Sequence, residues 1–325
     1  MSIPDFKVLD DRVREAGLYE RTYGKYIACF LAVFCGIGLS LYVVTLTDNV
    51  YVQIVNALFF SFVLVQGGML GHDLSHGQVF LSKSDNHSWG VIMWGLIGGL
   101  SEGGWYDKHN AHHKHVNHNG LDPDLNIPFI FSDVQLESKT ALTKKFIQPY
   151  QHILFFVLLP FVYPNFVLWS TLRVFGSMST INVLEAFLMI VHFAVFFYVP
   201  LAFLPLHVAL IFFAVTFITI GTYMGMVFAP NHKGEMVIAA DAEHTWVHQI
   251  TATRNLHYWF PTFIIFAGLD LQVEHHLFPS MPRFNYPKAQ KFVKEFCKEN
   301  DIRYYETSWT GSMKEIYESL KLHTI

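Results

Sequence analysis

Charged residues are scarce in this chain of 325 residues. Aspartate, glutamate, lysine and arginine make up 15% of the sequence, whereas 52% of it is hydrophobic and 16% is aromatic. A soluble domain of this size carries about 25% charged residues, and the mean hydropathy here is +0.31. The composition excludes an ordinary soluble domain and indicates that lipid is part of the chain's solvent.

The sequence also lacks a disulfide framework and a cleavable signal peptide. Its cysteines, Cys29, Cys35 and Cys297, are too few and too scattered to form a framework. The first segment of the chain is polar and of mixed charge, without a short apolar core. The net charge of −4 offers no basic footprint, so no nucleic-acid partner is expected.

Four apolar stretches have the length of about 20 residues that a helix needs to cross a hydrocarbon core. They run from Tyr26 to Leu46, Val50 to Gly71, Val183 to Phe203 and Leu206 to Ala229. The links within each pair are very short, so both pairs are predicted to be helical hairpins. None of the 22 lysines and arginines falls in these hairpins, and the positive-inside rule therefore makes the remaining segments cytosolic.

The predicted fold class is an all-α integral membrane protein, with four transmembrane helices in two hairpins and a cytosolic helical cap. The predicted segments of this one functional domain are 1–25 (cytosolic), 26–71 (first hairpin), 72–182 (cytosolic), 183–229 (second hairpin) and 230–325 (cytosolic cap). A further apolar stretch, 152–169, is interrupted by Pro160 and Pro164 and is interpreted as an interfacial helix. If that stretch crosses the membrane, the orientation of everything after it reverses.

Histidines, in contrast, are clustered in three short motifs. The motifs are HDLSH with His72 and His76, HNAHH with His109, His112 and His113, and QVEHH with Gln272, His275 and His276. On a helix, residues three and four apart lie on one face, so each motif presents its side chains together. Each motif follows an even number of predicted crossings, and all three are therefore expected to meet at the cytosolic side.

This set of side chains predicts a site for two metal ions. Imidazole is the commonest protein metal ligand, and the set exceeds the four positions of one zinc. The Glu-x-x-His of helical di-iron sites and the His-Glu-x-x-His of zinc proteases are both absent. Spacing alone leaves iron and zinc open. Nearby acids and amides are expected to accept the second N–H of the ligands; the candidates are Asp73, Asp107, Asn110, Asp241 and Glu274.

At these residues the sequence resembles the membrane fatty acid desaturases, whose three histidine boxes have the forms H-x(3,4)-H, H-x(2,3)-HH and (H/Q)-x-x-HH. The resemblance extends over nearly the whole chain. Gln272 at the head of the third box is similar to the front-end subgroup, which places a new double bond between an existing one and the carboxyl end. The resemblance also implies a ligand after the fourth span, for which His232 is preferred to His248.

The resemblance implies two iron ions (Fe2+/Fe3+), O2 as co-substrate and a fatty acyl substrate carried by CoA, a carrier protein or a lipid. The chain has no His-Pro-Gly-Gly haem motif, so no bound haem is expected, and a separate cytochrome b5 or ferredoxin is expected to supply electrons. The expected location is the endoplasmic reticulum of a eukaryote or the inner or plasma membrane of a bacterium. Whether Gln272 binds metal directly stays open.

Trp105 and Tyr106 are candidates for the substrate entrance or for interfacial anchors.

Other functions fit some of the same residues. A hydroxylase or related oxygenase would use the same dimetal scaffold, and a zinc-dependent membrane lipid hydrolase would need only one ion. A metal transporter needs an ion path, whereas the predicted spans contain Glu185 as their one acid.

His115 and His118 are expected in solvated or hydrogen-bonding roles, and Asp122 and Asp124 as turn residues around Pro123.

Overall fold

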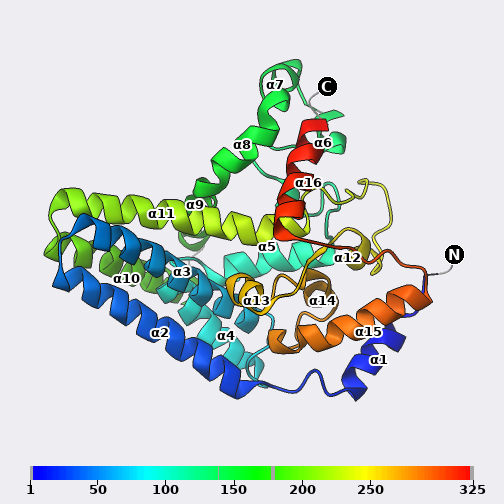
Figure 1. The fold of residues 1–325 in the computed structure, drawn as a ribbon, viewed down its shortest axis with the longest axis horizontal. Helices are drawn as coiled ribbons and strands as arrows, with labels where there is room; N and C mark the ends of the chain where they lie inside the picture. The colour runs from blue at the N-terminus through cyan, green and yellow to red at the C-terminus, as the bar shows by residue number, and fades with distance from the viewer. Residues whose placement is uncertain (1–2, 138, 177–179, 323–325) are drawn as a thin grey trace. The chain divides into compact units, whose positions relative to one another are not determined.

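The computed structural model describes residues 3–137, 139–176 and 180–322 (Figure 1). The ends of the predicted segments 1–25 and 230–325, and four positions within 72–182, lie outside the described residues. The helices and strands of the described chain are all helices except for a pair of two-residue strands, which confirms the all-α prediction. It divides into two compact units. The membrane-helix unit is Arg21–Asp107 with Leu159–Gly225, and the histidine unit is Met1–Glu20, Lys108–Leu158 and Met226–Ile325.

The membrane-helix unit consists of long apolar helices and their short connections. Its elements are α2 (Tyr23–Leu46), α3 (Val50–Ser75), α4 (Lys83–Ile92), the π-helix η1 (Met93–Ile97), the 3₁₀-helix η4 (Leu159–Phe161), α9 (Val162–Gly176), α10 (Thr180–Phe203) and α11 (Leu206–Phe228), whose last turn belongs to the histidine unit. Figure 1 shows α2, α3, α10 and α11 running side by side. Phe60 of α3 joins them, since its ring lies 6.2 Å from Phe196 of α10 and 5.9 Å from Phe212 of α11.

Five helical stretches of the described chain are long and apolar enough to cross a membrane. Four of them correspond to the predicted spans, and together they identify an integral membrane protein. The fifth, Ala141–Gly176, contains the stretch interpreted as interfacial. It is not one regular helix, because α8 (Gln151–Leu158) gives way to η4 at Pro160, which has no backbone N–H to donate. The number of crossings and the side of the histidine boxes stay predictions.

A close helix contact accompanies this break. A Cβ built on Gly221 of α11 would collide with the carbonyl of Pro160, and one on Gly225 would meet the side chain of Leu159. The glycines therefore let α11 approach η4 at backbone distance, which a larger side chain at Gly221 would prevent.

The histidine unit is built from shorter helices. Its elements are α1 (Phe6–Glu15), most of α5 (Glu102–Lys114), η2 (Pro123–Leu125), α6 (Asp133–Glu137), α7 (Ala141–Phe146), η3 (Gln148–Tyr150), α8, η5 (Ala229–Asn231), α12 (His248–Thr251), β1 (Asn255–Leu256), α13 (Phe260–Phe266), α14 (Gln272–Leu277), η6 (Arg283–Asn285), α15 (Tyr286–Glu299), β2 (Glu306–Thr307) and α16 (Trp309–Leu322). Strands β1 and β2 pair in parallel.

The apolar core of this unit lies between α1, α14 and α15. Ala289, Val293 and Phe296 are buried at helical spacing on one face of α15 and contact Leu9 and Val13 of α1 within a single cluster. This core fixes the short helix α14, whose six residues carry the third histidine box. Without it, a helix of that length would not be stable in water.

Candidate metal centre

Helix α5, which carries the second histidine box, has a buried carboxylate at its beginning. Glu185 of α10 accepts hydrogen bonds from the backbone N–H of Gly103 at 2.9 Å and from the hydroxyl of Ser101 at 2.6 Å. A carboxylate at this position satisfies an N-terminal N–H group and opposes the positive end of the helix dipole. The one acid of the predicted spans thus has a structural role at the helix that presents His109, His112 and His113.

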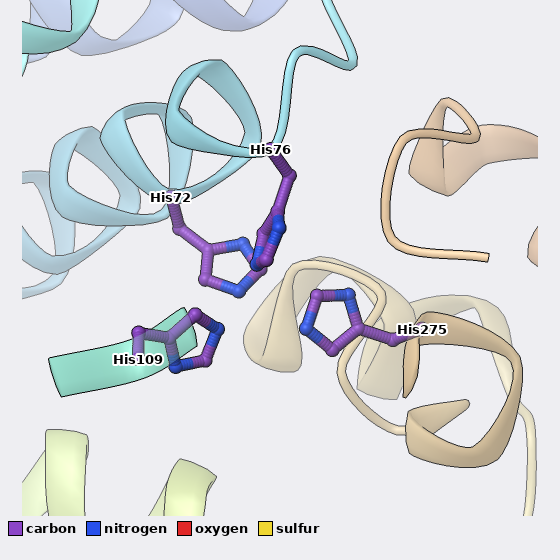
Figure 2. A group of neighbouring side chains, drawn as sticks. All are labelled: His72, His76, His109 and His275. Carbon is purple, nitrogen blue, oxygen red and sulfur yellow. The ribbon is translucent and has the colours of Figure 1, made fainter. Parts of the chain in front are cut away.

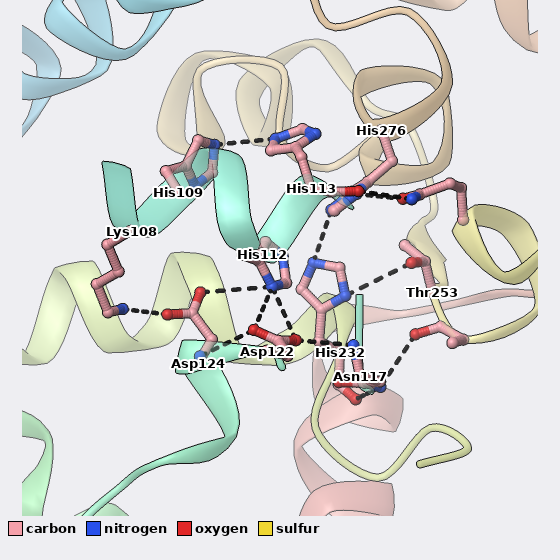
Figure 3. A network of polar contacts seen from close by, with 12 residues as sticks. Lys108, His109, His112, His113, Asn117, Asp122, Asp124, His232, Thr253 and His276 are labelled. Atoms are coloured by element: carbon pink, nitrogen blue, oxygen red, sulfur yellow. Dashed lines mark hydrogen bonds and ion pairs between the residues drawn. The ribbon is translucent and has the colours of Figure 1, made fainter. Parts of the chain in front are cut away.

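Three ring nitrogens of the histidine unit converge on one point. In this cluster, the 109–113–275 triad, the Nε2 atom of His113 lies 3.0 Å from that of His109 (Figure 3). The same atom lies 2.9 Å from Nε2 of His275. One ring nitrogen holds either a proton or a lone pair, so it cannot hydrogen-bond well to both neighbours. Two nitrogens bound to one ion at right angles are about 3.0 Å apart, which is the spacing seen here.

A second cluster, the 112–232–276 triad, has ligand atoms within 4.8 Å of one another. His232 follows η5, and its Nε2 atom lies 3.2 Å from that of His276. The ring of His112 is 4.7 Å from that of His232 and 5.0 Å from that of His276 (Figure 3). Of the two candidates for the extra ligand, the structure places His232 beside box residues. His248 instead contacts His244 and accepts the backbone N–H of Thr245 at 2.9 Å.

The outer ring nitrogens of three triad histidines face polar groups. Nδ1 of His112 lies 3.0 Å from both oxygens of Asp122, Nδ1 of His276 lies 2.8 Å from Oε1 of Gln249, and Nδ1 of His275 lies 3.1 Å from the Tyr286 hydroxyl. An acceptor at Nδ1 fixes the proton there and leaves the Nε2 lone pair for a metal, which is the usual support of a ligating imidazole.

Asp122 was expected only as a turn residue, and sequence reasoning missed its place beside His112. Its side chain also accepts the backbone N–H of Asn117 at 2.7 Å and of Asp124 at 2.8 Å. The carboxylate is buried and holds both the loop and the imidazole. A search for acids within about ten residues after a box, rather than only beside it, would have found Asp122.

Gln272 lies beside His232, and its neighbours orient its amide group. Nδ2 of Asn231 donates to the carbonyl of Leu269 at 2.6 Å and to Oε1 of Gln272 at 3.1 Å. Because the Leu269 carbonyl requires the Asn231 amino group, the oxygen of Gln272 faces Asn231. Its amino group then faces Nε2 of His232, at 3.1 Å, and an amide nitrogen is not a metal ligand.

Most of the acids and amides that were expected to accept the outer N–H of a ligand contact residues other than the histidines of the boxes. Asp73 lies 3.4 Å from Nδ1 of His72, and both are buried. Asp107 pairs with Arg173, and Asn110 is half-buried on α5. Glu274 accepts hydrogen bonds from Asn255 at 2.6 Å and Tyr304 at 2.8 Å. Burial raises the pKa of Glu274 to about 7.

The first histidine box lies at the end of α3 in the membrane-helix unit. The rings of His72 and His76 are 4.7 Å apart on one face of the helix (Figure 2). Trp105 presents its ring to both, at 5.2 Å from His72 and 6.1 Å from His76, and stacks on Trp94. Of the two aromatic candidates for the substrate entrance, Trp105 is only 5% exposed, whereas Tyr106 is 44% exposed.

Another group of histidines, separate from both triads, lies in the histidine unit. The ring of His244 is 5.1 Å from that of His248, 6.0 Å from that of His115 and 6.2 Å from that of His118. Both ring nitrogens of His118 lie near backbone carbonyls, of Asn119 at 3.0 Å and Ala242 at 3.1 Å. A hydrogen-bonding role was expected for His118, and these contacts fit it.

This group makes the stability of the metal-free protein depend on acid pH. Burial, and then the neighbouring imidazoles, lower the pKa of His244 to about 4. The unfolded chain therefore binds more protons than the folded chain between pH 6.5 and 4, and stability is lost as the pH falls through that window. Because His244 is partly exposed and solvent screens its charge, we expect His244→Gln to remove on the order of 1 kcal/mol of this loss. Thermal unfolding in detergent at pH 7 and pH 4.5 measures it, and equal losses in wild type and variant would contradict the assignment.

Comparison with known proteins identifies the family. The family described as Fatty acid desaturase matches residues 50–308, a range that contains every predicted metal ligand. The chain belongs to the fatty acid desaturase family. Its predicted class, an oxidoreductase of lipid metabolism, is thereby confirmed at the level of the family.

Several curated desaturases resemble the chain over most of its length. It is 28% identical to the Acyl-lipid (9-3)-desaturase of Physcomitrium patens over 98% of the chain and 62% of that protein. It is 26% identical to the Delta(8)-fatty-acid desaturase 1 of Arabidopsis thaliana over 94% of the chain and 71% of that protein. A Delta(6)-fatty-acid desaturase of Caenorhabditis elegans is 30% identical over 77% of the chain and 60% of its own length. The chain thus spans less than two thirds of two of these relatives.

The side chains in both triads fit the metal site typical of this family. Five imidazoles of the histidine unit direct Nε2 atoms at one another, and His112 brings a ring nitrogen within 4.8 Å of two of them; imidazole suits iron. Fixed outer nitrogens keep those lone pairs available. His112 contacts the carboxylate of Asp122 through Nδ1 and not through Nε2. The donor chemistry is therefore that of a nitrogen-ligated metal site.

Proposed function

We propose that the chain is a front-end fatty acyl desaturase that introduces a cis double bond between an existing double bond and the carboxyl end. The observation that carries the proposal is the pair of imidazole triads, each with fixed outer nitrogens, within a chain of the desaturase family. Gln272 at the head of the third box and relatives named Delta(6)-, Delta(8)- and (9-3)-desaturases support the front-end type.

The proposed ligands extend the two triads. One ion is held by the 112–232–276 triad and the other by the 109–113–275 triad, which His72 and His76 of the first box complete. The inclusion of the first box rests on the family resemblance and on the number of ligands that iron needs. Two bound iron ions would supply, with O2 and two electrons, the oxidant that removes two hydrogens from neighbouring methylenes.

The chain's own residues would hold and orient these ligands. Asp122, Gln249 and Tyr286 keep the protons of His112, His276 and His275 on Nδ1, so that each Nε2 faces inward. Trp94 and Trp105 form an apolar wall beside the first box that keeps bulk water away. The exposed Tyr106 is the better placed of the two entrance candidates. A separate cytochrome b5 or ferredoxin remains the predicted donor.

Lipid analysis of an expressing host tests the proposal. Gas chromatography with mass spectrometry should show a new alkene on the carboxyl side of an existing double bond, absent with empty vector and with a ligand variant. A new alkene elsewhere in the chain would contradict the front-end type alone. Hydroxylated chains without any alkene would favour the hydroxylase, and purified protein with one zinc and no iron would favour the hydrolase.

Gln272 is proposed to lie beside the 112–232–276 triad without binding iron, because its amino group and not its oxygen faces Nε2 of His232. We expect Gln272→Ala to retain both ions and to lower product formation by no more than about 10-fold, as for a neighbour of a ligand and not a ligand itself. Iron analysis of the purified variant measures this. Loss of one ion per chain would instead make Gln272 a direct ligand.

A further inference from the structure

His232 lies just after η5, in a turn that has no regular helix or strand to hold it. Arg254 binds the backbone on both sides of this histidine. Its Nε donates to the carbonyl of Pro230 at 2.5 Å, its Nη2 to the carbonyl of Lys233, and its backbone N–H to the carbonyl of Asn231 at 2.9 Å. One residue therefore satisfies three of the carbonyls that surround His232.

The guanidinium of Arg254 is 1% exposed, and two carboxylates balance its charge. Its Nη1 atom lies 3.1 Å from Glu235 and 2.7 Å from Glu315. A buried cation that loses one partner is strongly destabilised, because the remaining charge has neither water nor an anion nearby. The position of Arg254 thus depends on Glu315, which belongs to helix α16.

Helix α16 also contacts the His232 turn directly. The hydroxyl of Ser312 donates to the carbonyl of Pro230 at 2.6 Å, so this oxygen receives bonds from both Ser312 and Arg254. Glu315 is itself oriented by the hydroxyl of Tyr305 at 2.6 Å. The 112–232–276 triad therefore includes one ligand whose backbone is fixed from the C-terminal helix.

We propose that Arg254 is the positioning residue of His232, and that α16, through Glu315 and Ser312, sets how firmly the 112–232–276 triad retains its ion. The inference rests on the proposed ligand role of His232. It is specific to one of the two ions, because His275 of the other triad is supported by Tyr286, and His109 and His113 belong to α5. Weakening the α16 contacts should therefore release one ion and leave the other.

The variants Glu315→Gln and Ser312→Ala test this, with Glu318→Gln as the matched control on the same helix. Glu318 is exposed and pairs only across one turn of α16, with Lys314. Purified, iron-loaded full-length protein is titrated with a chelator, and the iron retained per chain is counted. Mössbauer spectra of the same samples report whether one iron environment is lost or both.

We expect Glu315→Gln to lose one ion per chain at about a 10- to 100-fold lower chelator concentration than wild type, and Ser312→Ala to follow more weakly. Glu318→Gln should match wild type. Arg254→Met should lose the same ion more readily, and Arg254→Lys should not restore it, because one ammonium cannot serve two carbonyls and two carboxylates. If the Arg254 variants do not fold, the α16 variants decide the matter.

Two results would overturn the inference. Retention of both ions at wild-type chelator concentrations in Glu315→Gln and Ser312→Ala would show that α16 does not act on His232. Parallel loss of both ions with a lowered unfolding temperature would show a general structural role. Wild-type protein that binds no ion would overturn the proposed centre as well, whereas lipid products without an alkene would overturn only the proposed reaction.

Discussion

His276→Ala is expected to abolish product formation while leaving folded, membrane-inserted protein. The variant removes an Nε2 donor that lies 3.2 Å from that of His232, and with it one inward-facing donor of the 112–232–276 triad. The loss should exceed about 100-fold, the upper end for changes to outer partners of ligands. The same result is expected for His113→Ala, whose imidazole stands between His109 and His275. Alkene formation in an expressing host, normalised to membrane-inserted protein, measures both.

His248→Ala is the matched control for this experiment. It removes an imidazole that follows the same predicted span as His232. This imidazole contacts His244 and the backbone N–H of Thr245 and not the triads. Product formation should stay within about threefold of wild type, as for a change away from the centre. Near-normal activity of His276→Ala, or inactivity of His248→Ala, would contradict the ligand assignment.

Asp122→Asn is expected to have the second largest effect. The carboxylate accepts three N–H groups, from His112 and from the backbone of Asn117 and Asp124. An amide has one acceptor end and one donor end, so one of these N–H groups must face a donor. Nδ1 of His112 lies 3.0 Å from both oxygens, so it keeps one acceptor in the variant but loses the charged partner that fixes its proton, and iron affinity should fall about 10- to 100-fold.

Iron retained against a chelator measures this change, and Asp124→Asn is its control. The Asp124 side chain is 40% exposed, pairs with Lys108 and lies 3.7 Å from Nδ1 of His112, farther than the 3.0 Å of Asp122, so its loss should change iron retention by less than about threefold. If Asp122→Asn behaves like Asp124→Asn, the carboxylate serves only the loop.

Local patterns in the sequence predicted the family and most of the histidines that the structure brings together in the two triads. The spacing within a motif such as HNAHH, which lies in α5, is enough to predict that its histidines share one helix face. Helix geometry fixes the relative positions of residues three and four apart, so no information from the rest of the chain is needed. The length of each apolar stretch can likewise be counted in the sequence alone. Four of the five candidate spans matched predicted ones, and the fifth is the stretch where Pro160 interrupts the helix, which length alone cannot assign.

Supporting residues other than Asp122 could not be predicted because they come from distant parts of the chain. Gln249 meets His276 and Arg254 meets Glu315 only after the histidine unit has folded. The choice between His232 and His248 also depends on tertiary contacts, since both follow the same span. The orientation of Gln272 depends on Asn231 and the carbonyl of Leu269, and no spacing rule contains that information.

The imidazoles of the two triads have a consequence for redox chemistry. Each is a neutral donor, so six of them would bring no negative charge to the proposed pair of iron ions. Carboxylate donors would offset much of the ions' charge and favour the ferric state, whereas the carboxylate of Asp122 lies behind His112. The proposed centre would therefore favour the ferrous state, and a donor of modest reducing power would suffice to load it with electrons.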